Sequence, residues 1–343
     1  RPAERKLLSA DDAVFVRLIA RRTWRFFESF VGAEDNWLPP DNYQEDPAPV
    51  TAHRTSPTNI GLLLLATCSA RDLGYVGALE FVEREELTFS TMAQLNRLHG
   101  HFFNWYDTKT LEPLLPQYIS TVDSGNLAGH LIAVKQACIE CPETRLFDVR
   151  VVEGLTDTIN AIDAEASALG SFRQRTDVVT VRQLQDEIAA CRSILQVDPG
   201  ERLSSWIALF DAVGRRASEI EDIVNALVHE HGEVSFKELR WWVGALQHQI
   251  KAIRRDAESL TNWGRLLPSV EKEIKDADNE WAPVLRLLQQ VPTLAEIPQL
   301  CDKALVQLAA MQDNVSTAAG QLTKALEQSA GASSDMLSRL SRL

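Results

Sequence analysis

The spacing of apolar residues predicts helices along most of the chain. In the first half we expect four helices, at about 11–31, 57–74, 76–98 and 123–138, because apolar positions recur there at three- and four-residue intervals. Ser9 and Asp12 form a capping pair at the start of the first helix. Ser56 and Pro57 start the second, since serine caps well and proline suits the first helical position. A short hairpin is expected around 107–109.

The second half reads as one helix after another. Two series of apolar residues repeat at alternating three- and four-residue spacing, which predicts seams that pack against partner helices at a shallow angle. The first is Val181, Leu184, Ile188, Cys191 and Leu195, and the second is Phe236, Leu239, Val243, Leu246, Ile250 and Ile253. Breaks are expected at 198–200, at 231–232, near Pro268 and at 292–298. The chain is therefore predicted to be all-α.

Composition divides the chain near residue 150. All four tyrosines and nine of the twelve phenylalanines precede that point, as do nine of the fourteen prolines. An aromatic half rich in loops, followed by a helical half, suggests a unit that carries a site and then a scaffold. We therefore expect two domains, 1–148 and 149–343, the second an elongated helical bundle with coiled-coil-like seams.

Charge and composition exclude several classes of protein. A net charge of −13 leaves no basic face for nucleic acid. No apolar run reaches the roughly 20 residues of a membrane span, and the N-terminus has no secretory signal. The five cysteines are too scattered for a disulfide scaffold, which favours a reducing compartment. The chain starts at Arg1 without an initiator methionine, so we expect a piece of something longer.

The loop 36–45 reads NWLPPDNYQE and holds two aromatic rings, three amides and two carboxylates. Aromatic plates beside bidentate polar side chains suit a sugar, which has apolar C–H faces and a rim of hydroxyls. They do not suit a phosphate, whose binding loop needs glycines and a lysine. The alternative is a surface loop pinned by Trp37 and stiffened by Pro39 and Pro40.

Two further motifs stand at loop–helix junctions. The segment 99–107 (HGHFFNWYD) places adjacent rings and a carboxylate near a turn, and its histidine spacing matches no standard zinc site. In 120–129 (STVDSGNLAG), Asp123 and Ser124 compete to cap a helix whose free N–H groups can bind oxygen atoms. A simple helix cap is the alternative. Cys138 and Cys141 lack a partner pair for zinc and are expected to be structural thiols.

Taken together, these motifs are much more specific than each is alone. They resemble the middle domain of the bacterial cyclic β-1,2-glucan synthases, strongly over residues 10–145, and after that only as a helical insertion. One departure is Gln117, where a basic residue is expected. The segments that carry the resemblance are 36–45, RTSPTNIG at 54–61, GHFFNWYDT at 100–108 and YISTVDSGNLAGH at 118–130.

The resemblance implies a fold, a substrate and a location. Such synthases are very large inner-membrane proteins with a glycosyltransferase region, a glucoamylase-like (α/α)6 toroid in the middle and a phosphorylase-like region. Residues 1–148 would form an incomplete part of that toroid, on the cytoplasmic side, without a membrane span. The implied activity is closure of linear β-1,2-glucan into a ring by retaining transglycosylation. The implied partners are β-1,2-glucan and the other domains of the same polypeptide, with no cofactor, metal or nucleic acid.

The resemblance also implies where substrate contacts lie. The catalytic carboxylates are expected beyond Leu343, so this chain would supply part of the glucan cleft. We expect Trp105, Asp107, Asp123 and Asn126 to face one cleft with Trp37, and Tyr43 and Arg54 to lie near its rim. Asp107 and Asp123 are the only local acids to test for catalysis, and each is interpreted first as a binding residue.

The alternative function is purely structural. In that interpretation the chain is a helical scaffold that docks neighbouring domains and binds no sugar. The two interpretations differ in where Trp37, Tyr43, Trp105 and Tyr106 lie: on one exposed concave face for a sugar site, or all buried for a scaffold. A partial toroid is also expected to leave the apolar helix around 60–66 without cover, which would favour aggregation or dimerisation.

Overall fold

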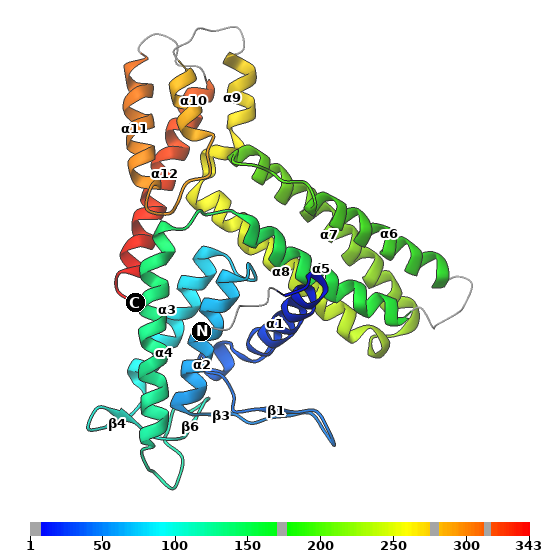
Figure 1. The fold of residues 1–343 in the computed structure, drawn as a ribbon, viewed down its shortest axis with the longest axis vertical. Helices are drawn as coiled ribbons and strands as arrows, with labels where there is room; N and C mark the ends of the chain where they lie inside the picture. Colours follow the sequence, from blue (N-terminus) through cyan, green and yellow to red (C-terminus); the bar gives the residue numbers. More distant parts are fainter. Residues whose placement is uncertain (1–7, 170–176, 275–280, 312–316) are drawn as a thin grey trace, which may run out of the picture.

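The computed structural model describes residues 8–169, 177–274, 281–311 and 317–343. These form an all-α protein, as predicted, with twelve α-helices among the described residues and only three pairs of two-residue strands. The helices of the first part lie beside those of the second, and the C-terminus returns towards α3 and α4 (Figure 1). No helix in the described ranges is long and apolar enough to cross a membrane.

The four helices predicted in the first part are confirmed. They are α1 (Ala10–Phe30), α2 (Pro57–Asp72), α3 (Ala78–Gln94) and α4 (Thr121–Glu140). Ser9 caps α1 and Ser56 caps α2, as expected. The start of α4 was predicted too late: Ser120 accepts a hydrogen bond from the N–H of Asp123 and is the N-cap, which leaves Asp123 in the first turn.

Short strands connect the loops between these helices. β1 (Tyr43–Gln44) pairs with β2 (Val50–Thr51), and β4 (Arg97–Leu98) pairs with β5 (His101–Phe102). β3 (Arg54–Thr55) pairs with β6 (Tyr106–Asp107), so Arg54 lies opposite Asp107. The predicted turn after Asp107 is present, since Tyr106 bridges back to Pro113. The β3–β6 pair therefore ties the loop that precedes α2 to the loop that precedes α4.

The second part contains eight helices among the described residues. α5–α8 form one group, and α9–α12 form another at the far end of the molecule (Figure 1). The two predicted seams lie on α6 and α8, and all but Val181 are buried. The bounds are α5 (Val149–Ala168), α6 (Asp177–Leu195), α7 (Leu203–His231), α8 (Lys237–Leu260), α9 (Leu267–Ile274), α10 (Ala282–Leu288), α11 (Ile297–Ala310) and α12 (Thr317–Leu340).

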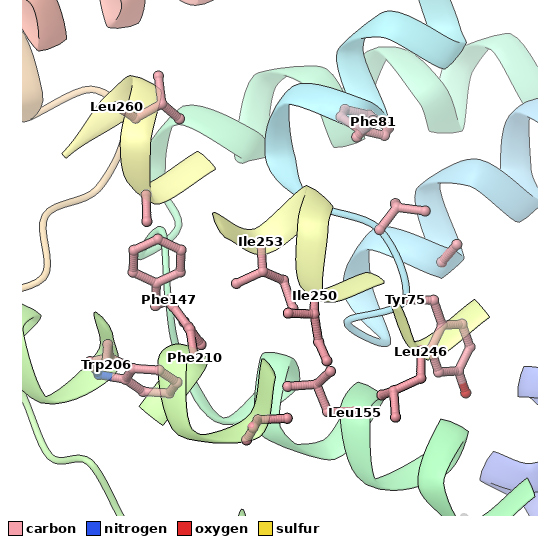
Figure 2. Packing of buried hydrophobic residues seen from close by; sticks show 14 of the residues in the cluster. Tyr75, Phe81, Phe147, Leu155, Trp206, Phe210, Leu246, Ile250, Ile253 and Leu260 are labelled. Atoms are coloured by element: carbon pink, nitrogen blue, oxygen red, sulfur yellow. The ribbon is translucent and has the colours of Figure 1, made fainter. Parts of the chain in front are cut away.

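Helix α8 joins the two parts through a continuous apolar core. Leu246, Ile250 and Ile253 on one face of α8 lie between Leu155 of α5 and Tyr75, which follows α2 (Figure 2). Each of these side chains is at most 4% exposed. Burial of this kind contributes about 1.5–3 kcal/mol per large aliphatic side chain. The core therefore crosses residue 148, and the division into 1–148 and 149–343 stays a prediction.

Polar contacts reinforce the same junction. Asp256 of α8 is buried and accepts hydrogen bonds from the N–H groups of Ala78 (2.6 Å) and Leu79 (3.1 Å). It therefore caps α3 from another helix, where Gly77 offers no side chain of its own. Burial raises the pKa of Asp256 to about 7, although the two N–H donors lower it. At the other end, Arg339 of α12 forms an ion pair with Glu86 of α3 at 2.6 Å.

The helix expected to lack cover is largely buried. Ile60, Leu63 and Leu64 of α2 are at most 2% exposed, and only Leu62 faces solvent. Uncovered apolar side chains lie instead on α1, where Phe15 is 62% exposed, and on α4, where Val122 is 70% exposed, Ile132 72% and Ile139 57%. Helix α4 packs on α2 with one side and leaves the other open, because the described helices of the second part return to α3 rather than to α4.

Candidate functional site

A connected set of polar side chains and one aromatic ring lies where α2 and α4 begin. Arg54 on β3 donates to Asp41 Oδ2 from Nε (3.1 Å) and from Nη2 (2.8 Å). Its guanidinium also lies over the ring of Trp105, 4.8 Å from the ring centroid. Asn59 in the first turn of α2 donates to the other oxygen of Asp41 at 3.3 Å. The loop, β3 and α2 are thereby held around one indole ring.

The same set continues to α4 through Asp123. Thr58 of α2 donates to Asp123 Oδ1 at 2.6 Å, and Asn126 donates to the Thr58 hydroxyl at 3.3 Å. In the amide orientation that its neighbours require, Asn104 donates to Asp123 Oδ2 (3.0 Å) and accepts from Trp105 Nε1 (2.7 Å). Trp105 therefore connects the two halves, and we call the whole set the Asp123 network. Its members are Asp41, Arg54, Thr58, Asn59, Asn104, Trp105, Asp123 and Asn126.

The Asp123 network can bind a neutral polar ligand. Two helix N-termini meet there, and their partial positive charge favours the carboxylates of Asp41 and Asp123. Arg54 and Asn126 are exposed and Trp105 is half-buried, so hydrogen-bonding groups and part of an indole ring reach the surface. This combination of a ring with fixed amides and carboxylates suits the hydroxyls and C–H faces of a sugar.

Asp107 lies next to this network, but its carboxylate stabilises the turn that follows it in the sequence. One of its carboxylate oxygens accepts from the backbone N–H of Lys109 (2.9 Å) and of Thr110 (2.8 Å). The Thr110 N–H, with that of Lys109, lowers the pKa of Asp107 below its ordinary value, although partial burial acts the other way. A carboxylate held in this way is a poor proton donor, so its placement indicates a structural use.

Trp37 lies on a different surface from the one expected. It adopts a left-handed backbone conformation (φ 60°), and its carbonyl oxygen accepts from Thr88 of α3 at 3.2 Å. Thr91 holds the carbonyl of Asn36 at 2.6 Å in the same way. The loop is therefore fixed to α3, and Trp37 lines a hollow of about 280 Å³ between α3 and α8.

That hollow contains a buried acid. Glu80 accepts at Oε1 from Arg84 (2.7 Å) and from His248 (3.0 Å), while its Oε2 atom has no hydrogen-bond partner. Burial acts to raise the pKa of Glu80, but the bond to His248 and the charge of Arg84 lower it to about 2. The Trp37 surface therefore carries an ion-paired cluster separate from the Asp123 network.

Tyr43 lies on a third surface. Its ring packs against Phe30 of α1, with centroids 4.7 Å apart, and lines a groove beside the start of α8. Of the expected residues, the structure thus brings together Arg54, Trp105, Asp123 and Asn126. It places Asp107 beside them on β6, with its carboxylate bonded within its own turn, and separates Trp37 and Tyr43 from them. The loop diverges because Trp37 is fixed to α3 while Tyr43 follows β1 away from it.

The four aromatic side chains match neither the arrangement expected for a sugar site, one exposed concave face, nor that expected for a scaffold, complete burial. Tyr106 is fully buried, and its hydroxyl donates to the carbonyl of Asn96 at 2.6 Å. Trp37, Tyr43 and Trp105 are half-buried and line different surfaces. The four rings therefore neither share a concave face nor all lie in the core.

Four members of the Asp123 network were not among the expected site residues. Asp41, Thr58, Asn59 and Asn104 all lie inside the motifs that carry the resemblance, but of these only Asn104 is adjacent to an expected residue, Trp105. Their signal was the clustering of hydroxyl and amide side chains at a helix start, which by itself also fits plain capping.

A fully buried acid, Glu85 of α3, was not anticipated either. Both of its carboxylate oxygens lack a hydrogen-bond partner, and burial raises its pKa well above the ordinary value. Burial likewise raises the pKa of Cys68 and of Cys138, with the charge of Glu85 as a further cause; for Cys138 the value reaches about 12. All five cysteines are buried and unpaired, and the described residues contain no cluster of three or more metal-ligand side chains.

Comparison with known proteins confirms the resemblance noted from the motifs. The chain is 42% identical over 245 residues to the cyclic β-(1,2)-glucan synthase NdvB of Rhizobium meliloti (strain 1021). The matched stretch is 71% of this chain. It spans 9% of the length of that protein. No protein-family model matches the chain. Because the matched stretch is longer than residues 1–148, the similarity must extend into the second, helical part.

Proposed function

We propose that this chain is a segment of a cyclic β-1,2-glucan synthase and that it contributes part of the surface that binds the glucan during cyclisation. The name of the relative supplies the reaction, and the similarity covers 71% of this chain. In the proposal, linear β-1,2-glucan is closed by retaining transglycosylation within a glucoamylase-like toroid, part of which is formed by residues 1–148. The parent enzyme is proposed to be associated with the inner membrane, with this segment on its cytoplasmic side.

The observation that carries the proposal is the Asp123 network. Trp105 offers a partly exposed indole ring, and the carboxylates and amides around it are fixed by one another at 2.6–3.3 Å. Side chains held in this way pay little conformational entropy when a sugar binds. Asp123 and Asn126 would accept from and donate to glucosyl hydroxyls, and Arg54 would keep the ring in position.

The network is a binding surface rather than the catalytic centre in this proposal. Retaining transfer needs a nucleophile and an acid about 5–5.5 Å apart, and the acid must hold a proton. Asp107 has a lowered pKa, and both oxygens of Asp123 already accept hydrogen bonds. The catalytic carboxylates are therefore assigned to other parts of the parent synthase.

Glucan binding by this chain is the first test. Titration calorimetry with linear β-1,2-glucan is expected to show binding that Trp105→Ala and Asp123→Asn each weaken by about tenfold or more, since losing such a contact costs about 1–3 kcal/mol. Lys135→Ala, an exposed change further along α4, is the matched control and should bind normally. Unchanged affinity in both site variants would contradict the proposal.

A second test concerns catalysis. The isolated chain is expected to form no cyclic product from linear β-1,2-glucan, because the proposal assigns the pair of carboxylates that transfer needs to other parts of the parent synthase. Chromatography and mass spectrometry of the reaction mixture would detect a ring by its loss of one water relative to the linear chain. Cyclic product from the purified chain would show that the acid and the nucleophile are already present in it.

The alternative is a non-catalytic helical scaffold that docks neighbouring domains. The exposed apolar side chains of α4 favour it, because apolar side chains left uncovered on a helix can pack against another element. The two functions are compatible, since a docking face on α4 and a sugar surface at its N-terminus use different residues.

A further inference from the structure

A groove of about 880 Å³ lies between α1, the β1–β2 hairpin and the start of α8. Five aromatic rings line it: Phe26, Phe30, Tyr43, Trp241 and Trp242. All but Trp242 are half-buried, so part of each ring faces solvent. The groove's volume lies near the upper end of the range of about 300–1,000 Å³ that is typical of ligand sites.

The charges around this groove balance. Arg22, Arg25 and Lys237 carry positive charge, and Glu45, Glu165 and Glu238 carry negative charge. Arg22 pairs with Glu165 at 3.4 Å, and Arg25 pairs with Glu238 through both carboxylate oxygens. The groove therefore presents many hydrogen-bonding groups, and the charges of its lining side chains sum to about zero. That combination disfavours a phosphate, a nucleic acid or another strongly charged ligand and favours an uncharged polyhydroxyl one.

The aromatic rings are held rigidly by contacts between the two parts of the chain. Arg25 of α1 lies 4.4 Å from the centroid of Trp241, which meets Trp242 edge to face at 4.8 Å. Phe30 and Tyr43 pack at 4.7 Å on the opposite side of the sequence division. Because both α1 and α8 contribute lining residues, the groove exists only when the two parts are packed together.

One buried donor in this groove has no partner. Trp242 is 1% exposed and lines the groove, yet its indole Nε1 hydrogen-bonds to none of the described groups. An indole N–H can only donate, and buried donors are normally satisfied. The donor itself is buried, so it marks an unsatisfied polar group in the wall of the groove rather than a direct contact for a ligand.

We infer that this groove, which we call the Trp241 groove, is a second carbohydrate site that binds a neutral gluco-oligosaccharide independently of the Asp123 network. The rings would stack on the C–H faces of successive sugar units, and the paired charges at the rim would hydrogen-bond to their hydroxyls. Only the choice of the β-1,2 linkage rests on the proposed function; the sugar class follows from the lining.

The test uses the full chain, a linear β-1,2-gluco-oligosaccharide and, as a comparison, a β-1,4-linked one of equal length. Nuclear magnetic resonance of the tryptophan indole N–H groups, combined with calorimetry, reports each site separately. In the native chain we expect two sites and shifts at Trp241, Trp242 and Trp105. Trp241→Ala and Tyr43→Ala should each weaken the groove site by about tenfold and leave the Trp105 shift unchanged. Trp241→Phe, which keeps a ring, should retain most of the affinity and guards against a folding defect.

The outcomes separate this inference from the proposed function. Loss of all binding in Trp105→Ala, or no indole shift at Trp241 in the native chain, would contradict carbohydrate binding in the Trp241 groove. Binding at the Asp123 network would remain supported. Binding that survives Trp105→Ala but disappears in Trp241→Ala would support the groove and count against the network. A proline-rich peptide that shifts Trp241 while both oligosaccharides fail to do so would overturn the inference in favour of a protein partner.

Discussion

Replacing Gly154 by alanine is expected to destabilise the protein by about 3 kcal/mol or more, because the new methyl group has no room. A Cβ atom at this position in α5 would lie 2.3 Å from the carbonyl oxygen of Gly74 and 2.8 Å from that of Leu73. Gly74 cannot move away easily: its φ of +79° suits glycine, and its oxygen accepts from the buried Gln249 of α8 at 2.7 Å. Three elements therefore meet at one backbone contact.

The matched control for that change is Gly244→Ala on α8. Gly244 is also helical, but a Cβ atom there would meet nothing within 4 Å. Alanine is favoured over glycine in a helix by about 0.5–1 kcal/mol, so this variant should be slightly more stable than the native chain. Urea denaturation followed by far-ultraviolet circular dichroism measures both. Equal stability of the two variants would show that the contact between α5 and the turn after α2 is looser than described.

The sequence predicted the helices well because their signals are local. Ser9, Ser56 and Pro57 act at the ends of α1 and α2, and the apolar repeats on α6 and α8 record which side of each helix is buried. The start of α4 was missed because Ser120, Asp123 and Ser124 are all competent caps, and only the tertiary structure selects Ser120.

The candidate site was predicted in part, for a related reason. Arg54, Trp105, Asp123 and Asn126 come together because short strand pairs and two helix starts fix their backbones near one another. Trp37 and Tyr43 are only six residues apart in the sequence, so they were expected to face the same side. Their separation follows from the left-handed backbone at Asn36 and Trp37 and from the threonines of α3, which no local pattern reveals.

The contact between the two parts was the least predictable feature. Asp256 caps α3 from nearly two hundred residues away, and Arg17 of α1 pairs with Asp157 of α5 at 2.8 Å. Such pairs leave no periodic trace in a single sequence. Buried acids belong to the same class, since Glu80, Glu85 and Glu86 look alike in an acidic helix and differ only in what surrounds them.

Replacing Glu85 by leucine is expected to stabilise the protein at neutral pH by about 1–4 kcal/mol, because a buried acid without partners is exchanged for an apolar side chain of similar size. The folded protein holds Glu85 at 0% exposure with both oxygens unpaired, and burial raises its pKa well above the ordinary value. The unfolded chain ionises at an ordinary pKa of about 4.3. Folding at any pH between the unfolded and the folded pKa of Glu85 is therefore coupled to the uptake of a proton.

The pH dependence distinguishes this effect from simple repacking. Because its folded-state pKa is raised, the contribution of Glu85 to stability is most favourable below about pH 4 and becomes less favourable as the pH rises towards the folded pKa. The gain from Glu85→Leu should thus be largest near pH 7–8 and shrink towards pH 4. Asp256, whose pKa is raised to about 7, also lowers the free energy of unfolding as the pH rises from about 4 to 7. The Glu85→Leu variant keeps this part of the pH dependence. Glu327→Leu, an exposed change on α12, should alter stability by no more than about 0.5 kcal/mol at either pH. A gain from Glu85→Leu that is equal at pH 4 and pH 7 would mean that Glu85 ionises normally in the folded protein, with a partner that satisfies its charge.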